Sequence, residues 1–192
     1  MPPKAKFTKQ SIIDAAFEIA KVEGLGGITI RKVADKLGSS IAPIYVNFKD
    51  VEELTGEVVR SIFELSRRLL KEHDTGNPFH DIGAASLRFA REYSVLFRDL
   101  ALKPNDHMSG YEEELTVLVA HMKSDPELEG FTEEELKGLL FKMRIFQLGL
   151  SVMVANGLLP DGFGEEMEQG LLDSTAKELI AAARMRKKGL SI

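Results

Sequence analysis

The segment ITIRKVADKLGSSIAPIYVNFKDVEEL, residues 28–54, contains two short helical patterns separated by a glycine. The first pattern has a single apolar stripe, formed by Ile30, Val33, Ala34 and Leu37. Thr29 is placed to cap this helix, and Gly38 stands where a glycine commonly ends one. A second short helix over residues 41–46 follows almost at once. Two helices joined by a three- or four-residue turn with glycine are typical of a helix-turn-helix.

The second short helix carries the functional prediction. In a helix-turn-helix the first helix braces across the phosphate backbone and the second enters the major groove of DNA. We expect Ser40 to cap the second helix, which puts Pro43 in the first turn, where a missing amide proton costs little. The spacing alone leaves an alternative open, because an ordinary corner of an all-α protein has the same pattern.

Charge is distributed unevenly along the chain. Residues 1–50 contain eight Lys or Arg and five Asp or Glu, a formal charge of +3. The other 142 residues contain 17 basic and 25 acidic residues, a formal charge of −8, so that the whole chain is at −5. A basic N-terminal segment on an acidic remainder indicates that the N-terminal segment contacts an anion.

The rest of the chain also has helical periodicity, with no convincing strand alternation. Thr8 is a candidate cap for a first helix that ends at the glycines after Glu23. Longer helices are expected over residues 50–73, 109–124, 132–156 and 165–188, and one helix or a bent pair over residues 78–102. Asp50, Asn77 with the following Pro78, Ser109 and Thr132 are placed to begin four of these segments, and residues 103–108 are expected to form a polar loop. The sequence therefore predicts an all-α fold of about nine helices, with a helix-turn-helix domain over residues 1–50 and a larger helical domain over residues 51–192.

Composition excludes several classes of site. The chain has no cysteine, so disulfides, thiolate nucleophiles and Cys-ligated zinc are excluded. The four histidines are scattered, and no glycine-rich phosphate loop or serine elbow is present, so we expect no metal, no cofactor and no enzymatic activity. The longest uncharged run, residues 145–160, is too short and too polar for a bilayer span. Together with the absence of an apolar signal core, this favours a cytoplasmic protein with no membrane partner.

A more specific pattern emerges from the order of residues in the N-terminal segment. The matching elements are Glu23-Gly24, Thr29, Val33-Ala34, Leu37-Gly38, Tyr45-x-x-Phe48, Lys49 and Glu52-Glu53-Leu54. These residues resemble the DNA-binding segment of the tetracycline-repressor (TetR) family of bacterial regulators. The match covers about 50 residues; the remaining two-thirds of the chain match only in the number and lengths of helices and in the final apolar pair.

The resemblance implies roles for individual residues. It implies that Tyr45 and Lys49 contact backbone phosphates, and that Thr29, Arg31 and Lys32 form a second phosphate clamp at a helix N-terminus. The DNA-facing positions that it implies in the turn and the second helix are Ser39, Ser40, Ile41 and Pro43. The sequence departs from the family pattern at Ser39, Ile41, Pro43 and Val46, which puts strong guanine-directed readout in doubt.

The last two long helices each carry an apolar stripe. The stripes are formed by Phe141, Ile145, Leu148 and Val152, and by Leu171, Thr175, Leu179 and Ala183. A monomer core would explain them, but the resemblance implies a symmetric four-helix dimer interface. A dimer also fits the DNA, because a helix-turn-helix dimer binds two half-sites about 34–36 Å apart, or a multiple of that, on a near-palindrome.

The middle helices are rich in large apolar residues. Spacing alone indicates core, whereas the resemblance implies an effector cavity that is mostly apolar. The residues that we expect to line it are Phe89, Tyr93, Phe97, Met122, Met143 and Gln147. The sequence thus predicts a ligand-responsive homodimeric transcriptional repressor that a small and mainly apolar effector releases from a near-palindromic operator in double-stranded DNA. The alternative is an all-α small-molecule carrier or enzyme without DNA binding.

Overall fold

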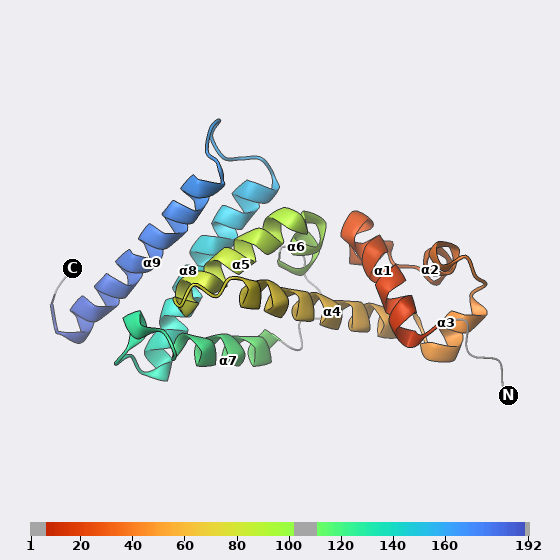
Figure 1. Ribbon diagram of the computed structural model, residues 1–192, viewed down its shortest axis with the longest axis horizontal. Coiled ribbons are helices and arrows are strands. Elements are labelled where there is room, and N and C mark those ends of the chain that lie inside the picture. The colour runs from red at the N-terminus through yellow and green to blue at the C-terminus, as the bar shows by residue number, and fades with distance from the viewer. Residues whose placement is uncertain (1–6, 102–110, 191–192) are drawn as a thin grey trace. The chain divides into compact units, whose positions relative to one another are not determined.

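The computed structural model describes residues 7–101 and 111–190 of the 192-residue chain, and within these ranges it contains helices and no strand (Figure 1). The helices are α1 (Lys9–Glu23), α2 (Ile30–Leu37), α3 (Ala42–Asn47), α4 (Val51–Glu72), α5 (Pro78–Glu92), α6 (Ser94–Ala101), α7 (Tyr111–Met122), α8 (Glu133–Ala155) and α9 (Glu165–Lys187). Two short 3-10 helices, η1 (Leu25–Gly27) and η3 (Pro126–Leu128), were not predicted. The all-α prediction, with nine α-helices in the described ranges, is confirmed.

The chain forms two compact units. The first contains residues 1–65 and 93–108, and the second contains residues 66–92 and 109–192. Helix α4 therefore supplies residues to both units, and α6 belongs with the N-terminal helices although it follows α5 in sequence. The predicted division into residues 1–50 and 51–192 stays a prediction.

Helix starts agree well with the caps expected from sequence. Thr8 begins α1 with a reciprocal capping box, and Thr132 begins α8 with another, in which the Glu135 carboxylate accepts a hydrogen bond from the Thr132 amide at 2.7 Å. Asp50 accepts from the Glu53 amide at 2.9 Å at the start of α4. Asn77 accepts from the His80 amide at 3.1 Å, with Pro78 as the first helical residue of α5.

The expected cap of α3 was wrong. Ser40 does not cap α3: the cap residue is Ile41, no side chain accepts there, and the first carbonyl used is that of Ile41. Of the two alternatives expected from residue 78 onward, one helix or a bent pair, the pair is observed: α5 and α6 are separated by a break at Tyr93, and α6 ends at Ala101. The expected loop at 103–108 and helix start at Ser109 lie outside the described residues.

The first unit has a core made by α1, α2 and α3. Helix α1 packs on α2, α3 and α6, and its buried residues include Ile12 and Ala16. Val33 of α2, Ile44 of α3 and Phe48 after it are all inaccessible to solvent or nearly so. Because α3 has only six residues, these tertiary contacts rather than its own hydrogen bonds must hold it in place.

The second unit is built around α5. This helix packs on α8, α9 and α7, and the core includes Leu87, Met122, Leu136 and Leu172 (Figure 1). A buried carboxylate caps the start of α5 from a distant part of the chain: Asp125 accepts a hydrogen bond from the Phe79 amide at 3.0 Å.

By length and composition alone α8 could cross a membrane, a property that core helices of soluble proteins share. One side of α8 lies in the core of the second unit at Leu136, Leu140 and Met143. Its first turn holds Glu133, Glu134 and Glu135. These features are those of a helix that packs on other helices.

Candidate nucleic-acid interface

Helix α3 has apolar side chains on two sides, one buried in the first unit and one exposed to solvent. Ile44 and the following Phe48 are 0% and 2% exposed and anchor the helix in the first unit. On the outside, Ile41 is 48% exposed, Tyr45 53% and Val46 82%. The chain therefore holds α3 by one apolar side and leaves another apolar side open, as a helix that enters a groove requires.

The turn before α3 contributes less polar surface than the sequence suggests. Ser39 is half-buried and its hydroxyl donates to the Ser40 carbonyl at 2.9 Å. Pro43 is half-buried, and its carbonyl accepts from the Asn47 side-chain amide at 2.8 Å. Ser40 itself is exposed.

The N-terminus of α2 has the features of a phosphate-binding helix end. The Thr29 hydroxyl accepts from the Lys32 amide at 3.2 Å, and Thr29, Arg31 and Lys32 are all exposed. The two cations differ, because the Lys32 ammonium pairs with the Glu23 carboxylate, whereas no ion pair is found for Arg31 within the described chain. Part of the charge of Lys32 is therefore already compensated.

Lys49 lies between α3 and α4 and is exposed. Its backbone amide donates to Glu53 at 2.8 Å, while its ammonium group has no ion pair among residues 7–101 and 111–190. Behind it, the Lys9 ammonium stands 5.2 Å from the centre of the Phe48 ring and 2.9 Å from the Glu57 carboxylate. The hydrogen bond from Lys9 is the main reason why the pKa of Glu57 is lowered, and Arg60 contributes.

Sequence reasoning missed one buried polar contact that supports these helices. Asp99 of α6 accepts from the Leu25 amide at 2.6 Å, directly after α1. The preceding Gly24 has φ +82°, and a Cβ there would overlap the Asp99 carboxylate. No local pattern around residue 99 predicts this, because the two partners are 74 residues apart; only the glycine that ends α1 gave a signal.

We call the predicted dimer residues of the last two long helices the α8–α9 face. Most of its α8 residues are exposed, whereas most of its α9 residues are half-buried, and Leu179 and Ala183 pack against the core of the second unit. On α8, Phe141, Ile145 and Leu148 are 68%, 60% and 40% exposed, and Val152 is half-buried. On α9, Leu171 is 39% exposed, and Thr175, Leu179 and Ala183 are half-buried. Gly149 is exposed on the same stretch of α8, and a Cβ there would meet nothing within 4 Å.

The expected effector residues are distributed over both units. Met122, Met143 and Gln147 are buried in the second unit, where the Gln147 amide lies 3.5 Å from the Gly83 carbonyl. Phe89 is half-buried in the same unit. Phe97 is buried in the first unit, and Tyr93 is half-buried there with the Lys21 ammonium 5.9 Å from its ring centre. A surface groove between α8 and α9 has other walls, among them Phe131, Lys142 and Arg186.

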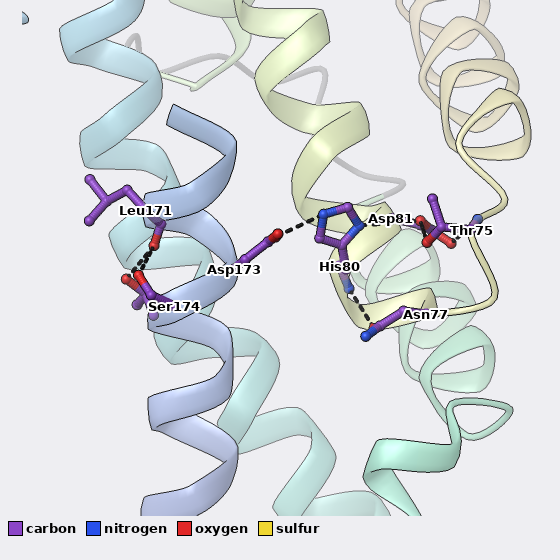
Figure 2. A network of polar contacts seen from close by, with 8 residues as sticks. Thr75, Asn77, His80, Asp81, Leu171, Asp173 and Ser174 are labelled. Carbon is purple, nitrogen blue, oxygen red and sulfur yellow. Dashed lines mark hydrogen bonds and ion pairs between the residues drawn. The ribbon is translucent and has the colours of Figure 1, made fainter. Parts of the chain in front are cut away.

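A polar network joins the start of α5 to α9 (Figure 2). His80 lies 2.8 Å from the Asp173 carboxylate through Nε2 and 3.4 Å from the Asp81 carboxylate through Nδ1. Buried Asp81 in turn accepts from the hydroxyl of Thr75 at 2.6 Å and from its amide at 3.1 Å. In the described part of the chain no three acidic or histidine side chains form a group that could hold a metal ion.

Comparisons with known proteins point to gene regulators. No family model matches the chain. The chain is 30% identical over 102 residues to the tetracycline repressor protein class D of Escherichia coli, which covers 53% of this chain and 43% of that protein. It is 24% identical over 185 residues to the uncharacterized HTH-type transcriptional regulator YobS of Bacillus subtilis, covering 79% of this chain and 97% of that one.

A solved structure has the same fold. A transcriptional regulator from Rhodococcus sp. Rha1 superposes with a TM-score of 0.69 at 18% identity, over 92% of this chain and 97% of that chain. The sequence match to the class D repressor is more limited in extent, since the chain spans less than half of that relative's length.

Proposed function

We propose that the chain is a member of the tetracycline-repressor family and acts as a ligand-responsive transcriptional regulator, a repressor that binds a near-palindromic operator as a homodimer. Its 30% identity over 102 residues to the class D tetracycline repressor supports this proposal. In this proposal it acts in the cytoplasm on double-stranded DNA, and a small, mainly apolar effector releases it. The N-terminal helix-turn-helix over residues 1–50 binds DNA, and residues 51–192 bind effector and partner subunit.

The observation that carries the proposal is the division of α3 into an anchored and an open side. Ile44 and Phe48 hold the helix, and Ile41 and Tyr45 remain free to meet a ligand. Arg31 before this helix and Lys49 after it supply cations that no acid in the described chain neutralises. In the proposed complex Tyr45, Lys49 and the Thr29–Arg31–Lys32 end of α2 hold phosphates, while Ser39, Ser40, Ile41 and Pro43 lie towards the bases.

The α8–α9 face supports the dimer. Three large apolar side chains, Phe141, Ile145 and Leu148, are exposed to solvent on one stretch of α8. Neighbouring exposed apolar side chains of this kind are typical of a surface that binds another protein. Gly149 provides room for a close approach of a second helix. A two-fold axis through this face would pair each α3 with a second copy and so account for two half-sites.

Effector control follows from linkage between two binding equilibria. The effector favours a dimer whose two α3 helices are wrongly spaced for successive grooves of DNA. Operator affinity then falls by the ratio of the effector affinities of the two states, which corresponds to a coupling free energy of roughly 1–3 kcal/mol. Helix α4 is our candidate for the connecting element, because it contributes residues to both units. Phe89, Tyr93, Phe97, Met122, Met143 and Gln147 are the proposed lining of the effector site.

The test is a titration of the full-length protein onto labelled DNA that flanks its own gene, with a scrambled duplex of equal length as control. We expect a retarded complex that forms at least 1,000-fold more tightly on the correct duplex, since specific binding typically exceeds non-specific binding by that ratio or more. An extract of small molecules from the producing cells should then dissociate it. Equal affinity for both duplexes would favour the alternative, an all-α carrier or enzyme.

A further inference from the structure

The outer surface of α3 offers little hydrogen-bonding capacity to a base edge. The side-chain amide of Asn47 donates a hydrogen bond to the Pro43 carbonyl, and the Ser39 hydroxyl donates one to the Ser40 carbonyl. What remains open on the helix and its cap residue is mostly hydrocarbon: Ile41, Ala42 and Val46, together with the ring of Tyr45.

Each base pair exposes a different set of groups in the major groove. Guanine, cytosine and adenine expose hydrogen-bonding atoms, and only thymine adds a methyl group. An isoleucine or valine pressed against a polar edge would displace water without replacing its hydrogen bonds, which costs free energy. Against a thymine methyl the same side chain buries apolar surface on both partners, which is favourable.

We propose that Ile41 and Val46 select the operator by contact with thymine C5 methyl groups, so that each half-site has A·T pairs where these side chains lie. This inference rests on the proposed function. It assigns sequence selection to the two exposed aliphatic side chains and leaves the phosphates to the cations.

DNA is the occupant that the surrounding charge favours. Residues 1–50 have an excess of three positive charges although the chain as a whole is acidic. Arg31 precedes α3 and Lys49 follows it, and neither has an ion pair in the described chain. An acidic polymer with apolar groups in its groove matches this combination, whereas a purely apolar protein surface would leave the cations without partners.

The experiment replaces thymine by uracil, which keeps base pairing and every hydrogen-bonding atom but lacks the methyl group. Duplexes are first enriched from a random 30-base-pair library on the full-length protein. The enriched duplex is then synthesised with deoxyuridine at one thymine position at a time, symmetrically in both half-sites. We expect about a fourfold loss of affinity for each buried methyl removed, hence about 16-fold for a symmetric pair, confined to a few positions.

Two outcomes separate the inference from the proposed function. If no duplex is enriched over the starting library, sequence-specific DNA binding itself fails. If a duplex is enriched but tolerates deoxyuridine at every position, the regulator stands and the thymine-methyl readout is overturned.

Variants assign the contact to the two side chains. Ile41→Ser and Val46→Ser remove the methyl groups at two exposed positions, so the fold should persist. Each should bind the thymine and the uracil duplex equally at one pair of positions and keep discriminating at the other. Val22→Ser, the same change as at Val46 but at a 75% exposed position of α1, is the matched control and should discriminate as the unaltered protein does. If both α3 variants keep the full preference for thymine, the assignment is overturned.

Discussion

Helices α3 and α8 both leave apolar side chains exposed, but the two surfaces differ in size and support. The open side of α3 belongs to a six-residue helix, which is held by Ile44 and Phe48 and by neighbouring helices. Helix α8 has 23 residues, its own capping box, and exposed side chains spread over about two turns from Phe141 to Leu148. A short, externally supported helix suits a groove, whereas a long apolar face suits another pair of helices.

The largest effect should come from breaking the α8–α9 face. Phe141→Glu places a charge in the proposed dimer interface, where it would be buried without a partner, so we expect the dimer dissociation constant to rise at least 100-fold. The monomer should stay folded, because Phe141 is 68% exposed. Sedimentation velocity measures the change, with operator binding as a second readout. Val117→Glu, at a 45% exposed position of α7, is the control; a Phe141→Glu protein that sediments like the unaltered chain would remove this face from the interface.

The second-largest effect should come from removing the Asp99 contact that supports the first unit. Asp99→Ala leaves the buried Leu25 amide without its acceptor, and we expect the free energy of unfolding to fall by about 1.5–3 kcal/mol. Urea denaturation measures it. Asp99→Asn keeps an oxygen that can accept from the same amide and should lose less. If Asp99→Ala unfolds at the same urea concentration as the unaltered protein, the contact does not stabilise the first unit.

The fold could be predicted from sequence where the determinants are local. Thr8, Asp50, Asn77 and Thr132 begin helices as expected, because a cap and its amide are three residues apart. The Ser40 cap prediction was wrong because the Ile41 carbonyl, one residue later, accepts the first backbone hydrogen bonds of α3, and no side chain caps the helix there. Asp99 could not be found, because its role depends on a partner 74 residues away.

The candidate sites divide along the same line. The outward positions of α3 follow from helical periodicity once Ile44 is assigned to the core. Periodicity also gives the apolar stripes of α8 and α9, but not that Phe141 and Ile145 are exposed while Leu179 and Ala183 pack on the core. The effector residues depend on how several helices pack, which periodicity does not determine. Buried Met122 and Met143 satisfy a core and a cavity lining equally well, so their role stays a prediction.

A smaller effect should distinguish the cations around α3. Lys49→Ala should weaken binding to all duplexes alike and reduce the slope of log affinity against log salt by about one unit, because one phosphate contact is lost. Lys32→Ala should reduce the slope less, since its ammonium already pairs with Glu23 in the free protein. Anisotropy titrations between about 50 and 200 mM salt give both slopes. An unchanged slope for Lys49→Ala would take Lys49 out of the phosphate contacts.

The smallest effect should come from the ion pair between Lys9 of α1 and Glu57 of α4. Hydrogen bonding from Lys9 lowers the pKa of Glu57 in the folded protein. A lowered pKa means that the ionised carboxylate stabilises the fold above the ordinary pKa of glutamate, and that this contribution disappears as the pH falls through the lower, folded value. Unfolding free energies of the unaltered protein and of Glu57→Gln should therefore converge on going from pH 6 to pH 3, with a difference of about 1 kcal/mol or less at pH 6 because Lys9 is largely exposed. Glu64→Gln, farther along α4, is the matched substitution and should show no such convergence; equal pH profiles for all three proteins would mean that the Lys9–Glu57 pair contributes nothing to holding the first unit together.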